Sequence, residues 1–486
     1  MRLVRVLRLT RRVCGLLVVA SSALPAQAPQ QQWSVPQMQE DLDVLRRAME
    51  EAHGGLHRWL TPADLDKRWN AHRAGLTTPL TTTAFAARVS EYVAEVRDGH
   101  LRLEYDSLTN AALVSARVLP LRVALEDERL IVRFNDSPTD TTIRPGMEIV
   151  RINGRSSQAL VKQLLPTISG DGFIVTGRRA RLAQNFAPLH WLFVEPTDRY
   201  RVVVRRDGGA EQETMLEGIE ESRRRSIVNP ANATLQTALS RLEAPPGLVS
   251  LDFPGGSGTA RLRIRAFDGQ AFPATLDSAF RVIRERGVTH LVLDMRGNGG
   301  GIDQYGALLV SYLVSKPFNY FDYIHLTSIA PSFATWLPRT FESTRNATVP
   351  HAGGGFRVTK ASHSGVGEQQ PAAQPYTGTL HVLIDGGSFS TTADVAAQLR
   401  SQGRAVFIGE ETAGTYEGNT SNLNAMIVLP NSRLRLKIMM YGYWNAVKPQ
   451  PGGRGTIPEH TVPTRVADQL QGRDRAIELA QQIRDK

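Results

Sequence analysis

Residues 381–399, HVLIDGGSFSTTADVAAQL, place one serine where an expected strand ends and an expected helix begins. Residues 381–384 form a short apolar run closed by an Asp-Gly-Gly turn, which is typical of a buried strand. The apolar spacing after Ser390 predicts a helix with one buried stripe. Free backbone N–H groups and the helix dipole at this N-terminus would stabilise an anion formed beside Ser390. A serine at such a position can also act only as the helix N-cap.

A second glycine-rich loop lies upstream of this segment. Residues 291–301, LVLDMRGNGGG, run from another short apolar strand into glycines, and a helical pattern follows. In an open α/β sheet, loops at the carboxyl ends of strands line a common crevice, so the two loops can face one site. Glycine backbone approaches a ligand closely and offers its N–H groups. A phosphate or dinucleotide loop is disfavoured because neither G-x-G-x-x-G nor G-K-[ST] occurs there.

Several segments, in the right order, resemble one family of serine peptidases. LVLDMRGNGGG, GGSFSTTADVAAQL and GEETAGTYEGNTS are similar to segments of the C-terminal processing (tail-specific) protease family. Its superfamily includes the tricorn core protease and interphotoreceptor retinoid-binding protein. VRDGHLRLEY near residue 100 resembles the family's histidine-bearing segment, and RGTIPEHTVPT near residue 459 resembles its closing strand. The resemblance is weakest over residues 317–375.

The resemblance implies an α/β fold with a crotonase/ClpP-like αββ core domain, a helical N-terminal domain and a PDZ-like β domain. Together with the residue patterns it predicts five segments: a signal peptide over 1–28, the helical domain over 33–110, the PDZ-like domain over 111–216, a linker over 217–247 and the serine peptidase core over 248–486.

The residue patterns support the first two folded segments. Helical periodicity predicts three helices that begin near Pro36, Thr61 and Thr82. Short strand patterns follow between residues 112 and 215, and residues 143–154, IRPGMEIVRING, resemble the middle of a PDZ-type domain. The carboxylate-binding loop of PDZ domains is not recognisable, so a structural spacer and a peptide clamp are equally open.

The first 28 residues have the composition of a secretory signal peptide. Five arginines and no acid precede the apolar run 13–20, and the segment ends in Ala-Gln-Ala. The apolar run is too short to remain as a membrane anchor, so we expect a periplasmic or extracellular protein without a stable anchor. Cleavage would also remove Cys14, the one cysteine, which excludes disulfides and zinc–thiolate sites from the mature chain. We expect no metal and no cofactor.

The charge of the chain argues against a nucleic-acid partner. The net charge of +10 includes five arginines of the expected signal peptide, which leaves about +5 on the mature chain. No dense Lys/Arg run remains, and residues 223–225, Arg-Arg-Arg, are interpreted as a solvated turn. The expected partner is a peptide or an unfolded protein, and the sequence makes no prediction of the oligomeric state.

The resemblance assigns roles to the candidate site residues. Ser390 is predicted as the nucleophile, and His100 as the general base, because the matching histidine has this role in tricorn-like members. An imidazole suits the role because its pKa lies near the working pH. The oxyanion would be bound by the N–H of Thr391 and by the N–H of Gly299 or Gly300.

The third member of the catalytic group stays open. The bacterial tail-specific branch pairs its serine with a lysine about 25 residues later, where this chain has Thr415, so the histidine arrangement is favoured. Glu410 or Glu411 could orient His100, although a structural salt bridge explains either residue as well. Asp98, two residues before His100, is a further candidate.

The sequence therefore predicts an exported serine endopeptidase. One alternative is a catalytically inactive family member that acts as a peptide- or lipid-binding module, with an apolar cleft and no reaction with a serine-directed phosphonate. The other is a crotonase-type acyl-CoA enzyme, which shares the core architecture and oxyanion glycines but would not need a serine at position 390.

Overall fold

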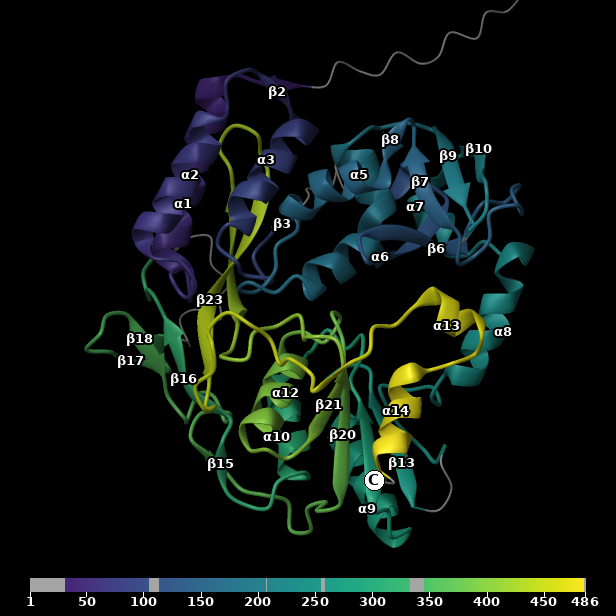
Figure 1. The fold of residues 1–486 in the computed structure, drawn as a ribbon. Helices are drawn as coiled ribbons and strands as arrows, with labels where there is room; N and C mark the ends of the chain where they lie inside the picture. The colour runs from purple at the N-terminus through teal and green to yellow at the C-terminus, as the bar shows by residue number, and fades with distance from the viewer. Residues whose placement is uncertain (1–30, 105–112, 207, 255–257, 333–344, 485–486) are drawn as a thin grey trace, which may run out of the picture.

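The computed structural model describes residues 31–104, 113–206, 208–254, 258–332 and 345–484. The expected signal peptide lies outside the described residues. Figure 1 shows a helical N-terminal part and a β domain side by side above a larger core. The predicted α/β class is confirmed, because helices and both parallel and antiparallel strands build the core. None of the described helices is long and apolar enough to cross a membrane.

The N-terminal part contains the three predicted helices, α1 (Val35–Ala52), α2 (Pro62–Ala74) and α3 (Thr82–Ala94). The side chains of Thr61 and Thr81 cap the N-termini of α2 and α3, as expected of threonine at this position. The buried faces of the helices belong to the same hydrophobic core as the strands of the larger body. The helices therefore pack on the rest of the protein through one continuous hydrophobic core.

The central sheet has the strand order β12-β13-β14-β20-β21-β24. The strands are β12 (Val249–Asp252), β13 (Thr259–Ile264), β14 (His290–Asp294), β20 (Thr379–Ile384), β21 (Val406–Gly409) and β24 (His460–Thr461). All neighbours pair in parallel except β12 with β13. The carboxyl ends of β14 and β20 lead directly into the two glycine-rich loops, as the sequence predicted.

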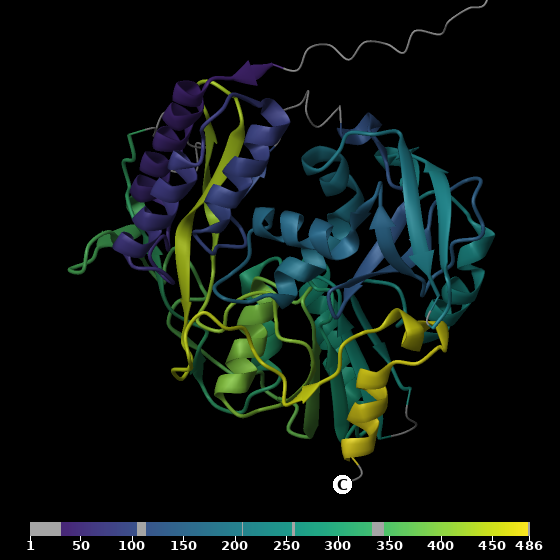
Figure 2. The same ribbon diagram turned by 45° about the horizontal axis from the view of Figure 1, so that its top comes forward.

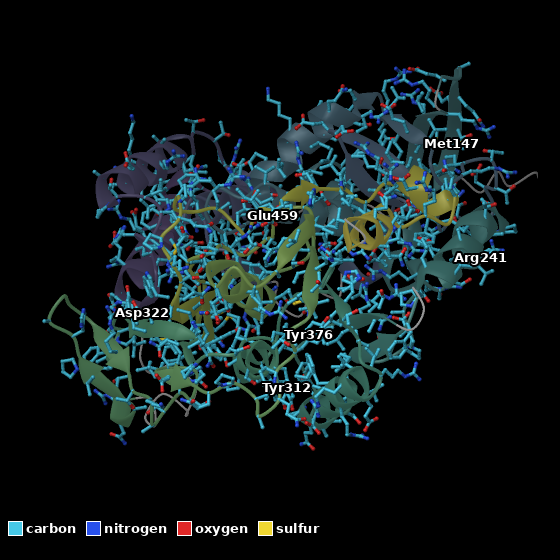
Figure 3. All side chains as sticks on the ribbon, turned by 60° about the horizontal axis from the view of Figure 1, so that its bottom comes forward. Met147, Arg241, Tyr312, Asp322, Tyr376 and Glu459 are labelled. Carbon is cyan, nitrogen blue, oxygen red and sulfur yellow. The ribbon has the colours of Figure 1, made fainter. Side chains whose placement is uncertain are left out.

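Helices cover both faces of this sheet, so its strands are apolar on both sides. Leu291 and Leu293 pack with α9 (Phe272–Glu285), α10 (Asp303–Ser311) and α12 (Thr391–Ser401), whereas Val292 points to the opposite face against α14 (Arg475–Arg484). At the lower end of the core, Tyr312 and Tyr376 lie close together (Figure 3), and the Tyr376 N–H donates to the Tyr312 carbonyl at 2.7 Å.

A second, antiparallel sheet joins the core to the N-terminal helices. Its order is β17-β18-β16-β23-β22, and β3 also pairs with β23. The strands are β17 (Thr348–Pro350), β18 (Phe356–Val358), β16 (Phe321–Leu326), β23 (Arg435–Asn445), β22 (Thr420–Val428) and β3 (Arg102–Glu104). The hairpin of β22 and β23 rises between the helices (Figure 2). Pairing of β3 with β23 places the preceding loop, with His100, against the core.

The β domain has its own hydrophobic core. Its sheet contains β5 (Leu121–Glu126), β6 (Arg129–Asn135), β7 (Glu148–Ile152), β8 (Arg155–Ser156), β9 (Arg199–Arg205) and β10 (Glu211–Glu217). The sequence missed its helices α5 (Ser157–Leu164) and α6 (Thr176–Phe193). In α6, Pro188 lies inside the helix and Asn185 has non-helical backbone angles, which interrupt the helical pattern.

The segment predicted as a linker, residues 217–247, contains the helices α7 (Glu221–Arg224) and α8 (Ala233–Leu242). The interpretation of its three arginines as a solvated turn is wrong for Arg224. This side chain is buried, pairs with Glu221 at 2.7 Å and lies 3.9 Å from Asp136. A guanidinium can be buried here because carboxylates compensate its charge.

Asp41 on α1 offers a test of the junction between the helices and the second sheet. Its buried carboxylate accepts the N–H groups of Asn431 and Ser432, both at 2.9 Å, in the turn between β22 and β23. We expect Asp41→Ala to lower the free energy of unfolding by about 1–3 kcal/mol, because it leaves two N–H groups without their acceptor. Chemical denaturation measures this loss.

The matched control is Asp43→Ala on the same helix. Asp43 is half-buried at the surface and pairs with the half-buried Arg73 at 2.9 Å, so its removal should cost less than about 1 kcal/mol. Equal losses for the two variants would contradict a structural role for Asp41.

Candidate active site

Ser390 lies between the end of β20 and the first residue of α12, where it is the N-cap residue. Its backbone angles are φ 56° and ψ −130°, a conformation that is costly for any residue other than glycine. The preceding turn is held by Asp385, whose Oδ1 accepts the N–H groups of Gly297 and Gly387 at 2.8 and 2.9 Å. The two glycine-rich loops are thus tied together beside the strained serine.

The structure brings His100 to Ser390 across 290 residues of sequence. His100 Nε2 lies 3.3 Å from Ser390 Oγ. The imidazole also packs against Phe389, with ring centroids 4.4 Å apart, so its plane is fixed next to the serine. This geometry allows a proton to pass from the hydroxyl to the imidazole.

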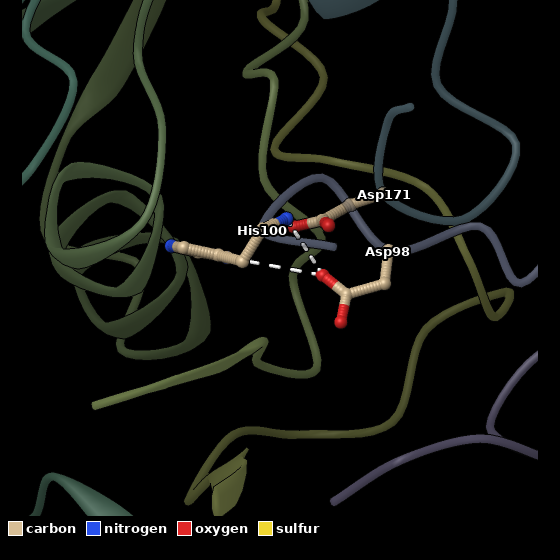
Figure 4. A group of neighbouring side chains, drawn as sticks. All are labelled: Asp98, His100 and Asp171. Carbon is tan, nitrogen blue, oxygen red and sulfur yellow. Dashed lines mark hydrogen bonds and ion pairs between the residues drawn. The ribbon is translucent and has the colours of Figure 1, made fainter. Parts of the chain in front are cut away.

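Asp98 is the carboxylate beside His100. Its Oδ1 accepts the His100 backbone N–H at 2.8 Å and lies 3.9 Å from His100 Nδ1 (Figure 4). Its Oδ2 accepts hydrogen bonds from His53 Nε2 at 2.7 Å and from the Thr420 hydroxyl. Burial would raise the pKa of Asp98, but the bond from His53 and the neighbouring imidazoles hold this pKa well below its usual value. Asp98 therefore remains ionised.

Glu410 and Glu411 do not contact His100 in the described part of the chain. Both carboxylate oxygens of Glu411 pair with Arg454 at 2.8 Å, and Oε1 also accepts the Gly455 N–H. The structural salt bridge, which the sequence left open, is thus the arrangement found for Glu411. Of the three acids considered for the third position, Asp98 is the one that lies next to His100.

Two residues of the β domain that the sequence did not single out hold the same loop. Asp171 Oδ1 accepts the Gly99 N–H at 2.5 Å, and Arg181 Nη1 donates to the Gly99 carbonyl at 2.7 Å. The Arg181 guanidinium also lies over the Phe389 ring at 4.5 Å. Burial, with Asp98 nearby, raises the pKa of Asp171 to about 7. No local motif marks either residue, because the contact depends on how the β domain packs on the core.

The environment of His100 keeps its imidazole neutral. Burial lowers the pKa of His100 to about 4; Asp98 opposes this shift, and the positive charges of Arg181, Arg102 and Lys437 reinforce it. A neutral imidazole at physiological pH has the free lone pair that a general base needs.

The backbone donors near Ser390 differ from the prediction in one respect. The N–H groups of Thr391 and Gly299 have no acceptor among the described residues. The N–H of Gly300, however, donates to Asn298 Oδ1 at 2.9 Å, so it is already occupied. Position 300 instead requires glycine for steric reasons, because a Cβ there would lie 2.7 Å from Ser390 Cβ. The sequence-based prediction of the oxyanion donors did not consider Asn298, whose side-chain oxygen accepts this N–H.

Ser390 and His100 open into a cavity of about 1180 Å³. The N-terminal part, the β domain and the core all contribute to its walls, for example through Val93, Leu189 and Phe267. The cavity is large enough to take several residues of a peptide.

Asp98, His100 and Asp171 have donor atoms within 4.8 Å of one another, which is close enough to bind a metal ion (Figure 4). Both oxygens of Asp98 and one oxygen of Asp171 already accept hydrogen bonds from the protein. Asp98 Oδ1 is thus occupied by the His100 backbone, and Oδ2 is occupied by His53 and Thr420.

The fold that carries this site is similar to the folds of solved structures. No curated protein sequence matches the chain. Among solved structures, mature CPAF superposes with a TM-score of 0.62 at 14% identity over 92% of this chain and 96% of CPAF. CPAF complexed with lactacystin superposes with a TM-score of 0.63 at 14% identity over 92% and 97%. The photosystem II D1 C-terminal processing protease gives a TM-score of 0.42 at 15% identity over 90% and 98%.

A family model agrees with this fold. Residues 258–461, which include Ser390 and both glycine-rich loops, match peptidase family S41. Residues 258–461 therefore form a peptidase family S41 domain, which makes the chain a serine-type peptidase.

Proposed function

We propose that this protein is an exported endopeptidase of the histidine-using branch, with Ser390 as nucleophile and His100 as general base. The distance of 3.3 Å between His100 Nε2 and Ser390 Oγ carries the proposal. Thr415, at the position of the lysine in the tail-specific branch, is buried and donates to the Gly418 carbonyl, which favours the histidine arrangement. The composition of residues 1–28 supports export.

In this reaction Ser390 Oγ attacks the carbonyl carbon of a peptide bond, while His100 Nε2 takes the hydroxyl proton. The N–H groups of Thr391 and Gly299 stabilise the oxyanion of the tetrahedral intermediate. His100 then gives the proton to the leaving amine, the C–N bond breaks, and an acyl-enzyme remains. Water attacks the acyl-enzyme with His100 again as the base, and the serine is regenerated.

Asp98 is proposed as the positioning residue of this group. Its backbone bond fixes the His100 loop, and its ionised carboxylate, 3.9 Å from Nδ1, stabilises the imidazolium that forms when Nε2 takes the proton. The proposed architecture for this chemistry is a crotonase/ClpP-like core with a PDZ-like β domain beside it. The proposed substrates are peptides or unfolded proteins, which fit the cavity.

Replacement of the nucleophile tests the proposal. We expect Ser390→Ala to abolish both peptide hydrolysis and labelling by a fluorophosphonate, with an unchanged circular dichroism spectrum. His100→Ala should slow labelling at least about 10³-fold, since the hydroxyl loses its base. Peptide mapping by mass spectrometry identifies the labelled residue.

Ser401→Ala, at the last residue of the same helix, is the matched control and should label like the wild type. If the wild type hydrolyses no peptide and Ser390 does not react, the binding-module alternative would replace the peptidase.

The pH profile tests the environment of His100. Because burial lowers the pKa of His100 to about 4, the base stays unprotonated as the pH falls through 6, and activity is lost only as the pH approaches 4. We expect kcat/KM for a peptide without lysine or arginine to be nearly constant from pH 7.5 to 5.5 in the Asp171→Asn variant, in which the carboxyl with a pKa of about 7 no longer titrates. Circular dichroism confirms that the protein stays folded. An acid limb centred near 6.5, the value of an exposed imidazole, would contradict the buried environment.

A further inference from the structure

The cavity around Ser390 has side chains of opposite charge on its walls. Arg102, Arg181 and Lys437 line it and lie close enough to His100 to lower the pKa of that imidazole. Asp303 and Asp394 also line the cavity, and each carries or can carry a negative charge. The catalytic chemistry proposed above uses neither of these two acids.

Asp394 is the acid nearest to the serine along the chain. It lies in the first turn of α12, where its N–H donates to the Ser390 carbonyl at 3.1 Å, and both residues line the cavity. Its side chain is only 2% exposed. No arginine, lysine or histidine forms an ion pair with Asp394 in the described part of the chain; its partners are the neutral amides of Asn419 at 3.1 Å and Asn445 at 3.0 Å.

These two asparagines leave acceptors unused. Each donates its amide nitrogen to Asp394, and the carbonyl oxygens Asn419 Oδ1 and Asn445 Oδ1 are buried without a donor. Asn419 is 5% exposed and lines the cavity. Buried polar atoms are nearly always satisfied in native proteins. Asn419 Oδ1 is an unpaired acceptor on a residue of the cavity wall, so a donor that reaches it with a ligand would complete its hydrogen bonding.

Asp303 adds a second carboxylate from another element. It is the first residue of α10, and its Oδ2 pairs with His363 Nε2 at 2.9 Å, while Oδ1 has no partner among the described residues. The starts of α10 and α12 lie side by side, because the Thr391 hydroxyl donates to the Gly301 carbonyl at 2.8 Å, and both acids line the cavity. Burial and, in addition, the negative charge of Asp303 raise the pKa of Asp394 to about 7. A cation placed between the two acids would relieve both the burial and this repulsion.

We propose that Asp394, Asp303 and Asn419 form a subsite that binds the cationic side chain of a lysine or arginine in the peptide substrate. The role of this subsite in cleavage rests on the function proposed above. A lysine ammonium has three N–H donors, which suit the acceptor atoms of these three residues. The buried position beside Ser390 makes the subsite selective, because an uncharged side chain leaves the acids unpaired.

A metal ion is a poorer occupant of the same place. The one group of described His, Asp and Glu residues with ligand atoms within 4.8 Å of one another is Asp98, His100 and Asp171. Asp303, Asp394 and His363 do not meet this condition, so they are not arranged around a single ion. An ammonium or guanidinium group donates hydrogen bonds of about 2.8–3.0 Å, which are longer than the ~2.0–2.6 Å bonds of metal ions to oxygen, so it suits acceptors that lie further apart.

Binding to the Ser390→Ala protein tests the subsite without any need for hydrolysis. The probes are pairs of acetylated and amidated peptides with one neutral sequence. The members of a pair differ at one position, which holds lysine in one peptide and its uncharged analogue norleucine in the other. Each position of the sequence is tested in turn. At one position we expect the lysine peptide to bind at least about tenfold more tightly in calorimetry. Equal binding at every position, or no binding of either peptide, would overturn the proposal.

Two variants identify the acids. In the Ser390→Ala background, Asp394→Asn should reduce the preference for lysine to less than about threefold, and Asp303→Asn should reduce it in part. Asp394→Asn keeps an oxygen acceptor for Asn419 and Asn445, and Asp303→Asn lies on another helix, so loss of preference in both does not reflect one local distortion. Asp268→Asn, an exposed acid at the cavity wall, is the control and should keep the preference. An unchanged preference in both subsite variants would overturn the assignment.

The test of the lysine subsite and the test of the proposed peptidase activity can fail independently. A lysine preference in binding together with an inert wild type would refute the peptidase and leave the subsite in place. Hydrolysis by the wild type without any preference in binding would refute the subsite and leave the peptidase in place.

Discussion

The buried carboxylate of Asp98 is the constraint on which the site depends. It joins His53 at the end of α1, the backbone of His100 and Thr420 at the start of β22, which are separated by up to several hundred residues of sequence. A charged group that is 5% exposed is stable only when its hydrogen bonds are satisfied, so these three segments must meet. Their meeting is what holds His100 at Ser390.

Residues of the β domain also bind the loop that carries His100. Asp171 accepts the Gly99 N–H, and Arg181 donates to the Gly99 carbonyl. Phe173 and Thr176 of the same domain donate to the backbone carbonyls of Gly453 and Glu411 in the core. Ser390 and His100, the proposed catalytic pair, therefore lie where three parts of the molecule meet. A displacement of the β domain would move Gly99, and with it the adjacent histidine.

The sequence predicted the elements whose signals are local. The strand, glycine turn and helix around Ser390 are contiguous in sequence, and His100 lies in a short recognisable segment. Asp98 could be considered because it is two residues from His100. Asp171, Arg181 and His53 carry no such signal, since each reaches the site only through packing between distant segments. The helix α6 was missed because Pro188 and Asn185 interrupt its pattern, and the occupied N–H of Gly300 follows from one Asn298 side chain.

The most direct test of the account is a crystal structure of the protein after reaction with a fluorophosphonate. The phosphonyl oxygen on Ser390 stands in for the oxyanion of the tetrahedral intermediate. We expect this oxygen to accept the N–H groups of Thr391 and Gly299, with His100 Nε2 within hydrogen-bond distance of Ser390 Oγ and Asp98 still bonded to the His100 backbone. An adduct whose oxygen points away from these donors, with His100 out of reach of Oγ, would contradict it.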